Sequence, residues 1–257
     1  MRKNILNILK KKNKTKIVCL TAYSKSVAKI LDEFCDIVLV GDSMAHVLYG
    51  QTNTHSVSLK NIIQHTISVK QGIKKSLLVV DMPKNSYNSL KKAKFNAKKI
   101  LNLTKCDAVK IENNNGNFKI LEGLVKAKIP VMGHIGYTPQ FKKKFKLEGD
   151  STSKKEKLLR EAQRIEKAGA FSIVLECVSS AAAKLITQKL SIPTIGIASS
   201  KFCDGQILVT DDLIGLSGFY PRFVKKYINM EKILNKAFAN YKKDVLSQKF
   251  PDKKHTY

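Results

Sequence analysis

The stretch DIVLVGDS at residues 36–43 is the clearest indication of how this chain folds. Four apolar, β-forming residues, Ile37 to Val40, lead directly into Gly41, Asp42 and Ser43. A run of this length is too short for a buried helix and is typical of a parallel strand covered on both faces. Because an ionised carboxylate at the end of such a strand is costly to bury alone, we expect Asp42 to have a partner.

Similar apolar runs recur along the chain. Six others are KIVCLTAY (16–23), LLVVDMP (77–83), DAVKIE (107–112), IPVMGHIG (129–136), FSIVLEC (171–177) and IPTIGIA (192–198). Between them lie stretches with apolar residues at helical spacing. These stretches are Val27 to Phe34, Leu59 to Ile73, Leu90 to Leu101, Ile120 to Val125 and Leu158 to Ile165.

The alternation of strands and helices predicts a (β/α)8 TIM barrel, with residues 1–257 as a single domain. We expect the eighth strand at PRFVKKY (221–227), a final helix at Glu231 to Leu246, and a short lead-in helix within residues 1–14. A doubly wound open sheet is the alternative. It is disfavoured because no predicted strand is followed by the G-x-G-x-x-G fingerprint.

The composition indicates a soluble globular protein. With 47 basic and 20 acidic residues the formal charge is +27, but the lysines are spread along the predicted helices and no nucleic-acid-binding motif accompanies them. We therefore predict no nucleic-acid partner and, lacking a long apolar run, no membrane span. The N-terminus has no signal-peptide core, and the cysteines form an odd set without a C-x-x-C pair, which favours a cytoplasmic protein with reduced thiols. The cysteines are Cys19, Cys35, Cys106, Cys177 and Cys203.

Polar residues stand at the ends of the predicted strands. The carboxyl ends of barrel strands form one face, which carries the active site. An acid at one strand end is most often a helix cap, but acids at four strand ends favour a shared site. The set is Tyr23, Asp42, Ser43, Asp81, Lys110, Glu112, His134 and Glu176.

Three carboxylates of this set, Asp42, Asp81 and Glu112, provide oxygen ligands that suit Mg²⁺ better than Zn²⁺. Such a metal could chelate an α-keto acid and stabilise its enolate. Glu176, flanked by Leu175 and Cys177, is then the candidate base, with a structural carboxylate paired to a lysine as the alternative.

Lys110 is a candidate for binding the substrate carboxylate, either in addition to or instead of neutralising the acids. His134 and Tyr23 are further candidates, although a histidine satisfied by the backbone is an equal alternative for His134. We expect His65, within a predicted helix, to be structural. A serine triad is not supported, because Ser43 lacks the G-x-S-x-G elbow.

Ten motifs in the same order, from about residue 12 to the end, resemble the ketopantoate hydroxymethyltransferase family. They are TAYSKSVAKILDE, VLVGDS, VVDMP, AVKIE, IPVMGHIGYTPQ, VLECV, SIPTIGI, DGQILV, PRFVKKY and FPDKKHTY. The resemblance implies a homo-oligomeric barrel, usually a decamer, with one Mg²⁺ per subunit. It also implies transfer of a one-carbon unit from 5,10-methylene-tetrahydrofolate to 3-methyl-2-oxobutanoate (2-oxoisovalerate), which gives ketopantoate for pantothenate synthesis.

The resemblance assigns the same residues to specific roles. It places the proton acceptor on Glu176 and the metal ligands on Asp42, Asp81 and Glu112. The substrate-binding set that it implies is Asp42, Ser43, Asp81 and Lys110.

The chain departs from the family pattern mainly in loops, where glycines are lost. A lost glycine matters where φ is positive or another backbone comes close, and asparagine tolerates positive φ better than serine. The stretch after TPQ is shorter than in the family and reads FKKKFKLEG. The substituted positions are Ala45, His46, Asn113, Asn114, Ala198, Ser199 and Ser200.

Two other hypotheses compete with this one. A Mg²⁺-dependent barrel of the phosphoenolpyruvate mutase and isocitrate lyase type is the alternative enzyme, but it needs a loop cysteine in a KCGH-like stretch, which this sequence lacks. A basic binding protein without catalysis is the alternative from another class.

Overall fold

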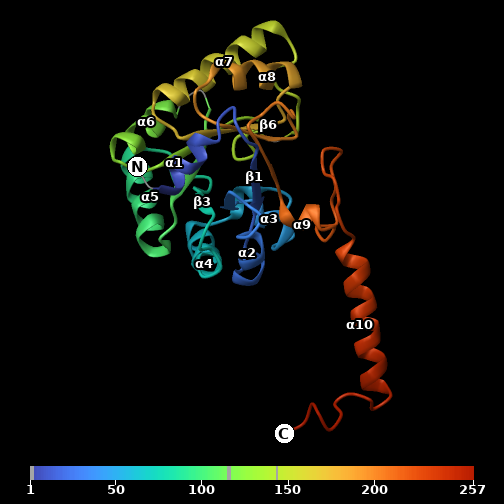
Figure 1. Cartoon of the computed structure of the whole chain (residues 1–257). Coiled ribbons are helices and arrows are strands. Elements are labelled where there is room, and N and C mark those ends of the chain that lie inside the picture. Colours follow the sequence, from blue (N-terminus) through green and yellow to red (C-terminus); the bar gives the residue numbers. More distant parts are fainter. Residues whose placement is uncertain (1–2, 115–116, 143) are drawn as a thin grey trace. The chain divides into compact units, whose positions relative to one another are not determined.

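Eight parallel strands close into a barrel in sequence order, and β8 pairs with β1. Figure 1 labels β1, β3 and β6 of these strands and the helices of the chain. The structure is a computed structural model that describes residues 3–114, 117–142 and 144–257. The predicted (β/α)8 barrel is confirmed. Its strands are β1 Ile17–Thr21, β2 Ile37–Val40, β3 Leu77–Asp81, β4 Ala108–Glu112, β5 Val131–Gly136, β6 Ser172–Glu176, β7 Thr194–Ile197 and β8 Gly205–Leu208.

The predicted helices are present, including the lead-in helix and the final helix. Serine side chains cap several of them: Ser58, Ser89 and Ser151 each accept a hydrogen bond from a backbone N–H of the first turn. The helices are α1 Lys3–Lys10, α2 Lys25–Leu31, α3 Met44–Val47, α4 Leu59–Lys70, α5 Leu90–Thr104, α6 Phe118–Lys126, α7 Thr152–Lys167, α8 Ser180–Lys189, α9 Thr210–Leu213 and α10 Met230–Leu246, with a 3₁₀ turn η1 at Thr54–Ser56.

Side chains alternate between two cores along each strand. Ile37 and Leu39 of β2 belong to the core inside the barrel, whereas Val38 and Val40 pack outward against the helices. Two residues of α1, Ile5 and Ile8, join the inner core and bury its amino-terminal end. The same alternation determines which residues at the other end of each strand point into the barrel.

The prediction of the eighth strand at residues 221–227 is wrong. The strand is Gly205–Leu208, and residues 221–227 form turns and irregular structure. The chain passes from Ile197 to Gly205 through a loop without a helix. Every other pair of consecutive strands is separated by a helix. The short apolar run QIL follows β7 without one, so the sequence pattern favoured the later run at residues 221–227 instead.

The chain divides into two compact units. The first, Met1–Val209, contains all eight strands, and the second, Thr210–Tyr257, contains α9 and α10. The single domain over residues 1–257 therefore stays a prediction. In the described ranges no helix combines the length and the apolar character needed to cross a bilayer.

The backbone shows where the glycine substitutions matter. Ala198, directly after β7, has a φ of +49°. Asn113 and Ser200 are not among the described residues with positive φ. Ser200 is buried instead, and its hydroxyl lies 3.0 Å from Ser180 Oγ and accepts a bond from Phe202 N. Of these three positions, Ala198 is therefore the one that carries backbone strain.

Replacing Ala198 by glycine should stabilise the protein. A left-handed conformation costs a residue other than glycine about 1–2 kcal/mol. Glycine removes this cost, but its greater conformational entropy in the unfolded chain offsets about 0.4–1 kcal/mol of the gain. We expect Ala198→Gly to raise the free energy of unfolding by up to about 1 kcal/mol in urea titrations.

Ser200→Gly is the matched control and should lower stability, because it removes two hydrogen bonds and relieves no strain. Equal changes in the two variants would contradict the assignment of strain to Ala198.

Candidate active site

The alternation along the strands brings the predicted residues together inside the mouth of the barrel. Asp81 ends β3, Lys110 and Glu112 lie on β4, His134 on β5, and Glu176 ends β6. All but Glu176 are buried, and Glu176 is partly exposed. The structure therefore places these predicted residues together at one end of the barrel, and their shared function stays a prediction.

Asp42 has the partners that its position required. Its backbone N–H donates to Asp81 Oδ2 at 3.0 Å, and its own Oδ2 accepts from the Gln140 amide at 2.8 Å. Burial and then the charge of Asp81 raise the pKa of Asp42 to about 7. The two aspartates thus lie side by side and repel each other when both are ionised.

Lys110 is the cation among these acids. Its Nζ lies 3.0 Å from Asp81 Oδ1, an oxygen that accepts no hydrogen bond of good geometry. Burial alone would lower the pKa of Lys110, but the charges of Asp81, Asp42 and Glu112 raise it. Lys110 therefore stays protonated.

Glu112 and His134 complete the interior. Glu112 Oε2 accepts from the backbone N–H of Gln140 at 3.0 Å, and burial followed by the charge of Asp42 raises the pKa of Glu112 well above its usual range. Burial and Lys110 lower the pKa of His134, so its ring is neutral. Because the Lys110 ammonium can only donate, His134 Nδ1 at 3.4 Å is the acceptor and Nε2 carries the proton.

Glu176 lies at the open edge of this group. His134 Nε2 is 3.1 Å from Glu176 Oε2, although not in hydrogen-bond geometry. Burial raises the pKa of Glu176 to about 7, against the opposing effect of Lys110. A carboxylate with this pKa can accept a proton near neutral pH.

The backbone around Glu176 is tightly constrained. Gly136 has a φ of +96°, and a Cβ there would lie 2.1 Å from the carbonyl oxygen of Glu176. The next residue, Tyr137, donates its N–H to that oxygen at 2.8 Å. Cys177 has a positive φ of +52°. The direction of the Glu176 side chain is thus set by backbone contacts on both sides.

Tyr23 and Ser43 form a hydroxyl pair beside Asp42, with Tyr23 OH 2.8 Å from Ser43 Oγ. His65, expected to be structural, bonds to the carbonyl oxygen of Tyr23 through Nδ1 at 2.8 Å and to Tyr49 OH through Nε2 at 2.9 Å. His65 therefore supports the segment that carries Tyr23.

The donor set fits a divalent cation with oxygen ligands. Four acids, Asp42, Asp81, Glu112 and Glu176, face one lysine, and Asp81 Oδ1 is a buried acceptor without a hydrogen bond. Among the residues that the structure describes, no group of three or more His, Cys, Asp or Glu side chains is arranged to hold a metal ion. The carboxylate oxygens are nevertheless the ligand type that hard divalent cations bind.

Gln140 and Tyr87 are components of the site that strand-end reasoning missed. Gln140 lies in the loop after β5 and bonds to Asp42, Glu112, Met82 and Tyr87. Its sequence signal is the TPQ that follows the glycine ending β5, a loop position outside the strand pattern.

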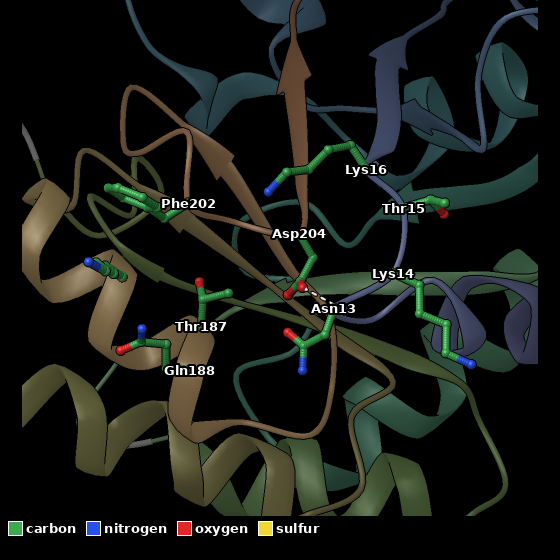
Figure 2. Close-up of a pocket in the computed structure, with 9 residues that line it drawn as sticks. Asn13, Lys14, Thr15, Lys16, Thr187, Gln188, Phe202 and Asp204 are labelled. Atoms are coloured by element: carbon green, nitrogen blue, oxygen red, sulfur yellow. Dashed lines mark hydrogen bonds between the residues drawn. The ribbon is translucent and has the colours of Figure 1, made fainter.

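A cavity of about 270 Å³ lies at the opposite end of the barrel (Figure 2). Thr15 and Lys16 precede β1, and Asp204 precedes β8, so these residues mark the amino ends of the strands. Asp204 is already bonded to Asn13 N and to Lys12. This cavity is separate from the acids at the carboxyl ends.

A parallel eight-stranded barrel with acids, a lysine and a histidine at the carboxyl ends of its strands is the architecture of a barrel enzyme. The ketopantoate hydroxymethyltransferase family model matches residues 2–253. The chain belongs to the ketopantoate hydroxymethyltransferase family.

Two relatives illustrate the similarity. The 3-methyl-2-oxobutanoate hydroxymethyltransferase of Pelagibacter ubique is 54% identical over 257 residues, covering 100% of both chains. The enzyme of the same name from Clostridioides difficile is 45% identical over 249 residues, covering 94% of this chain and 90% of that protein.

Solved structures with the same fold are more distant. Phosphonopyruvate hydrolase in complex with oxalate and Mg²⁺ has a TM-score of 0.62 and 11% identity, covering 99% of this chain and 93% of that chain. 2,3-Dimethylmalate lyase, a member of the PEP mutase/isocitrate lyase superfamily, has a TM-score of 0.58 and 14% identity, covering 100% of this chain and 93% of that chain. These likenesses show the fold alone.

Lys110→Met should destabilise the metal-free protein. The substitution leaves buried carboxylates without their cation, and breaking a buried ion pair from one side costs about 3–5 kcal/mol. We expect a loss of that order in urea denaturation at pH 8 with EDTA.

Lys75→Met is the control, because Lys75 forms an exposed pair with Glu33 at 2.6 Å. Its unfolding curve should nearly overlay that of the wild type. Similar curves for the two variants would show that Lys110 does not neutralise the cluster.

Proposed function

We propose that this protein transfers a one-carbon unit from 5,10-methylene-tetrahydrofolate to 3-methyl-2-oxobutanoate and so forms 2-dehydropantoate (ketopantoate), the first step of (R)-pantothenate biosynthesis. The observation that carries the proposal is the position of Glu176, a carboxylate with a pKa of about 7 at the open edge of a buried acid and lysine cluster. The name shared by its relatives supports the same reaction.

Asp42 and Asp81, supported by Glu112, would hold one Mg²⁺ per subunit. When bound, the metal polarises the keto group of the substrate and makes the neighbouring C–H more acidic. Lys110 binds the substrate carboxylate through its ammonium group. Ser43, oriented by Tyr23, donates a second hydrogen bond to the substrate.

Glu176 accepts the proton from C3 of the substrate. Lys110 favours the ionised form of that base, and the His134 ring, which is neutral, lies beside it with Nε2 3.1 Å from Glu176 Oε2. Water adds to the methylene carbon of the folate, and the bond from this carbon to the folate nitrogen breaks, so that tetrahydrofolate leaves and the one-carbon unit is released as formaldehyde. C3 of the enolate then forms a bond to this carbon, and the oxygen that came from water takes up a proton and becomes the hydroxyl group.

The alternative enzyme, of the phosphoenolpyruvate mutase and isocitrate lyase type, fits less well. Its members share the fold at 8–14% identity, whereas relatives with the hydroxymethyltransferase name share 44–54%. Turnover of 2-methylisocitrate without folate would favour the alternative.

We also propose that the protein is a homo-oligomer, with a decamer as in the family. On the outer face of β1 and β8, Val18 is 47% exposed, and its register neighbour Gln206 is exposed too. Helix α10 has no buried residue and exposes several large apolar side chains. They are Ile233, Phe238, Tyr241, Val245 and Leu246. We assign α10 of a second copy as the cover for this face.

The cytoplasmic location stays a prediction. The five cysteines are free and buried, as expected for a reducing compartment.

A coupled assay tests the reaction, the metal and the base together. Wild type with Mg²⁺ should form ketopantoate from both substrates, and EDTA should abolish this activity. Without folate, wild type should exchange the C3 proton of 3-methyl-2-oxobutanoate in deuterated water by NMR. Glu176→Gln should slow the exchange by about 10²–10⁴-fold, the usual contribution of a general base.

Glu33→Gln, which changes an exposed glutamate, should exchange at the wild-type rate. Exchange by Glu176→Gln at that same rate would eliminate Glu176 as the base. Absence of product from the wild type would instead contradict the proposed reaction.

The oligomer proposal predicts that a charge on either surface weakens assembly. Val18→Asp and Phe238→Asp should each shift the light-scattering mass toward smaller species, because each places a carboxylate in an apolar contact. Lys253→Asp, also exposed, is the control and should keep the wild-type mass. Unchanged mass in both test variants would reject this contact.

A further inference from the structure

Gln140 bonds to two acids of the site, and every polar group of its side chain has a partner. Its Nε2 donates to Asp42 Oδ2 at 2.8 Å and to the carbonyl oxygen of Met82 at 3.0 Å. Its Oε1 accepts from Tyr87 OH at 2.6 Å. Its backbone N–H donates to Glu112 Oε2 at 3.0 Å. Gln140 is buried, so these partners replace water.

The chemistry of the partners determines how the amide is oriented. The carbonyl oxygen of Met82 can only accept, so the atom that faces it must be the amide nitrogen. The amide oxygen therefore faces Tyr87, whose hydroxyl must donate. Tyr87 is buried, and burial together with the nearby carboxylates raises its pKa, so it keeps the proton to donate.

Gln140 binds one carboxylate oxygen of Asp42 and one of Glu112. Asp42 Oδ2 and Glu112 Oε2 are bound by Gln140, which leaves Asp42 Oδ1 and Glu112 Oε1 for another ligand. A neutral amide orients a carboxylate without cancelling its charge.

We infer that Gln140 is a positioning residue for the divalent cation: it holds one oxygen each of Asp42 and Glu112 so that the other faces the metal, and Tyr87 fixes its amide. The inference rests on the metal assignment of the proposed function. The amide side chain acts on Asp42, and the backbone N–H acts on Glu112. Residues that orient metal ligands in this way typically contribute about 10–100-fold to metal affinity.

Metal binding measured without substrates tests the inference. Mg²⁺ titrations by calorimetry and Mn²⁺ titrations by electron paramagnetic resonance give the dissociation constants. Gln140→Met keeps the backbone N–H and a similar side-chain length but removes the amide, and it should weaken binding of both metals at least tenfold. Tyr87→Phe leaves the amide without its donor and should weaken binding about threefold. Excess Mg²⁺ should restore kcat in Gln140→Met.

Asn96→Leu is the matched control. Asn96 is also a buried amide and donates to the carbonyl oxygen of Ser86 at 2.7 Å. Its substitution should lower the melting temperature but leave both dissociation constants within twofold of the wild type. If Asn96→Leu weakens metal binding as much as Gln140→Met does, the effect of Gln140 is one of general destabilisation, and the inference is overturned.

The remaining outcomes are also decisive. Wild-type affinity in Gln140→Met would overturn the inference while leaving the metal site intact. If Gln140→Met does not fold, wild-type affinity in Tyr87→Phe overturns it. Failure of the wild type to bind either metal would remove the metal assignment itself, and the inference with it.

Discussion

The burial of four carboxylates around one lysine is the constraint on which the site depends. The pKa values of Asp42, Glu112 and Glu176 are all raised, chiefly by burial, while Lys110 stays charged. A fold that places such a cluster in its interior is stabilised by any cation that enters it. The barrel supports this arrangement because its strands are anchored at the other end, where α1 and the inner core close the interior.

Asp42, Asp81 and Glu112 differ from Glu176 in the groups that contact their carboxylates. The first three have hydrogen-bond donors or a lysine within reach. Glu176 has a neutral histidine and an open edge, and its backbone is fixed by Gly136 and Tyr137. Acids held by donors suit ligand binding, whereas a rigidly placed acid at the open edge of the cluster suits proton transfer. The same residue type thus supports two roles because of its neighbours.

Much of this arrangement could be predicted from sequence because side chains alternate between the two faces of a strand, with a period of two residues. Once β3 to β6 were located, alternation placed Asp81, Lys110, His134 and Glu176 at one end of the barrel. The eighth strand was missed because the chain omits the expected helix before it. Gln140 was missed because a loop residue has no periodicity, and its partners come from separate strands. The local sequence pattern therefore predicts which residues lie at strand ends, but not which loop residues contact them.

The seam where β1 pairs with β8 and closes the barrel has an exposed apolar residue on its outer face. A parallel strand needs cover on both faces, yet Val18 on β1 remains exposed beside Gln206 on β8. Burying the Val18 side chain would be favourable, because apolar area would be removed from water. β1 leads directly to Tyr23, whose hydroxyl lies 2.8 Å from Ser43 Oγ, so this seam adjoins the candidate site. In the proposed oligomer, a second copy that covers Val18 would therefore stabilise a strand that leads into the site.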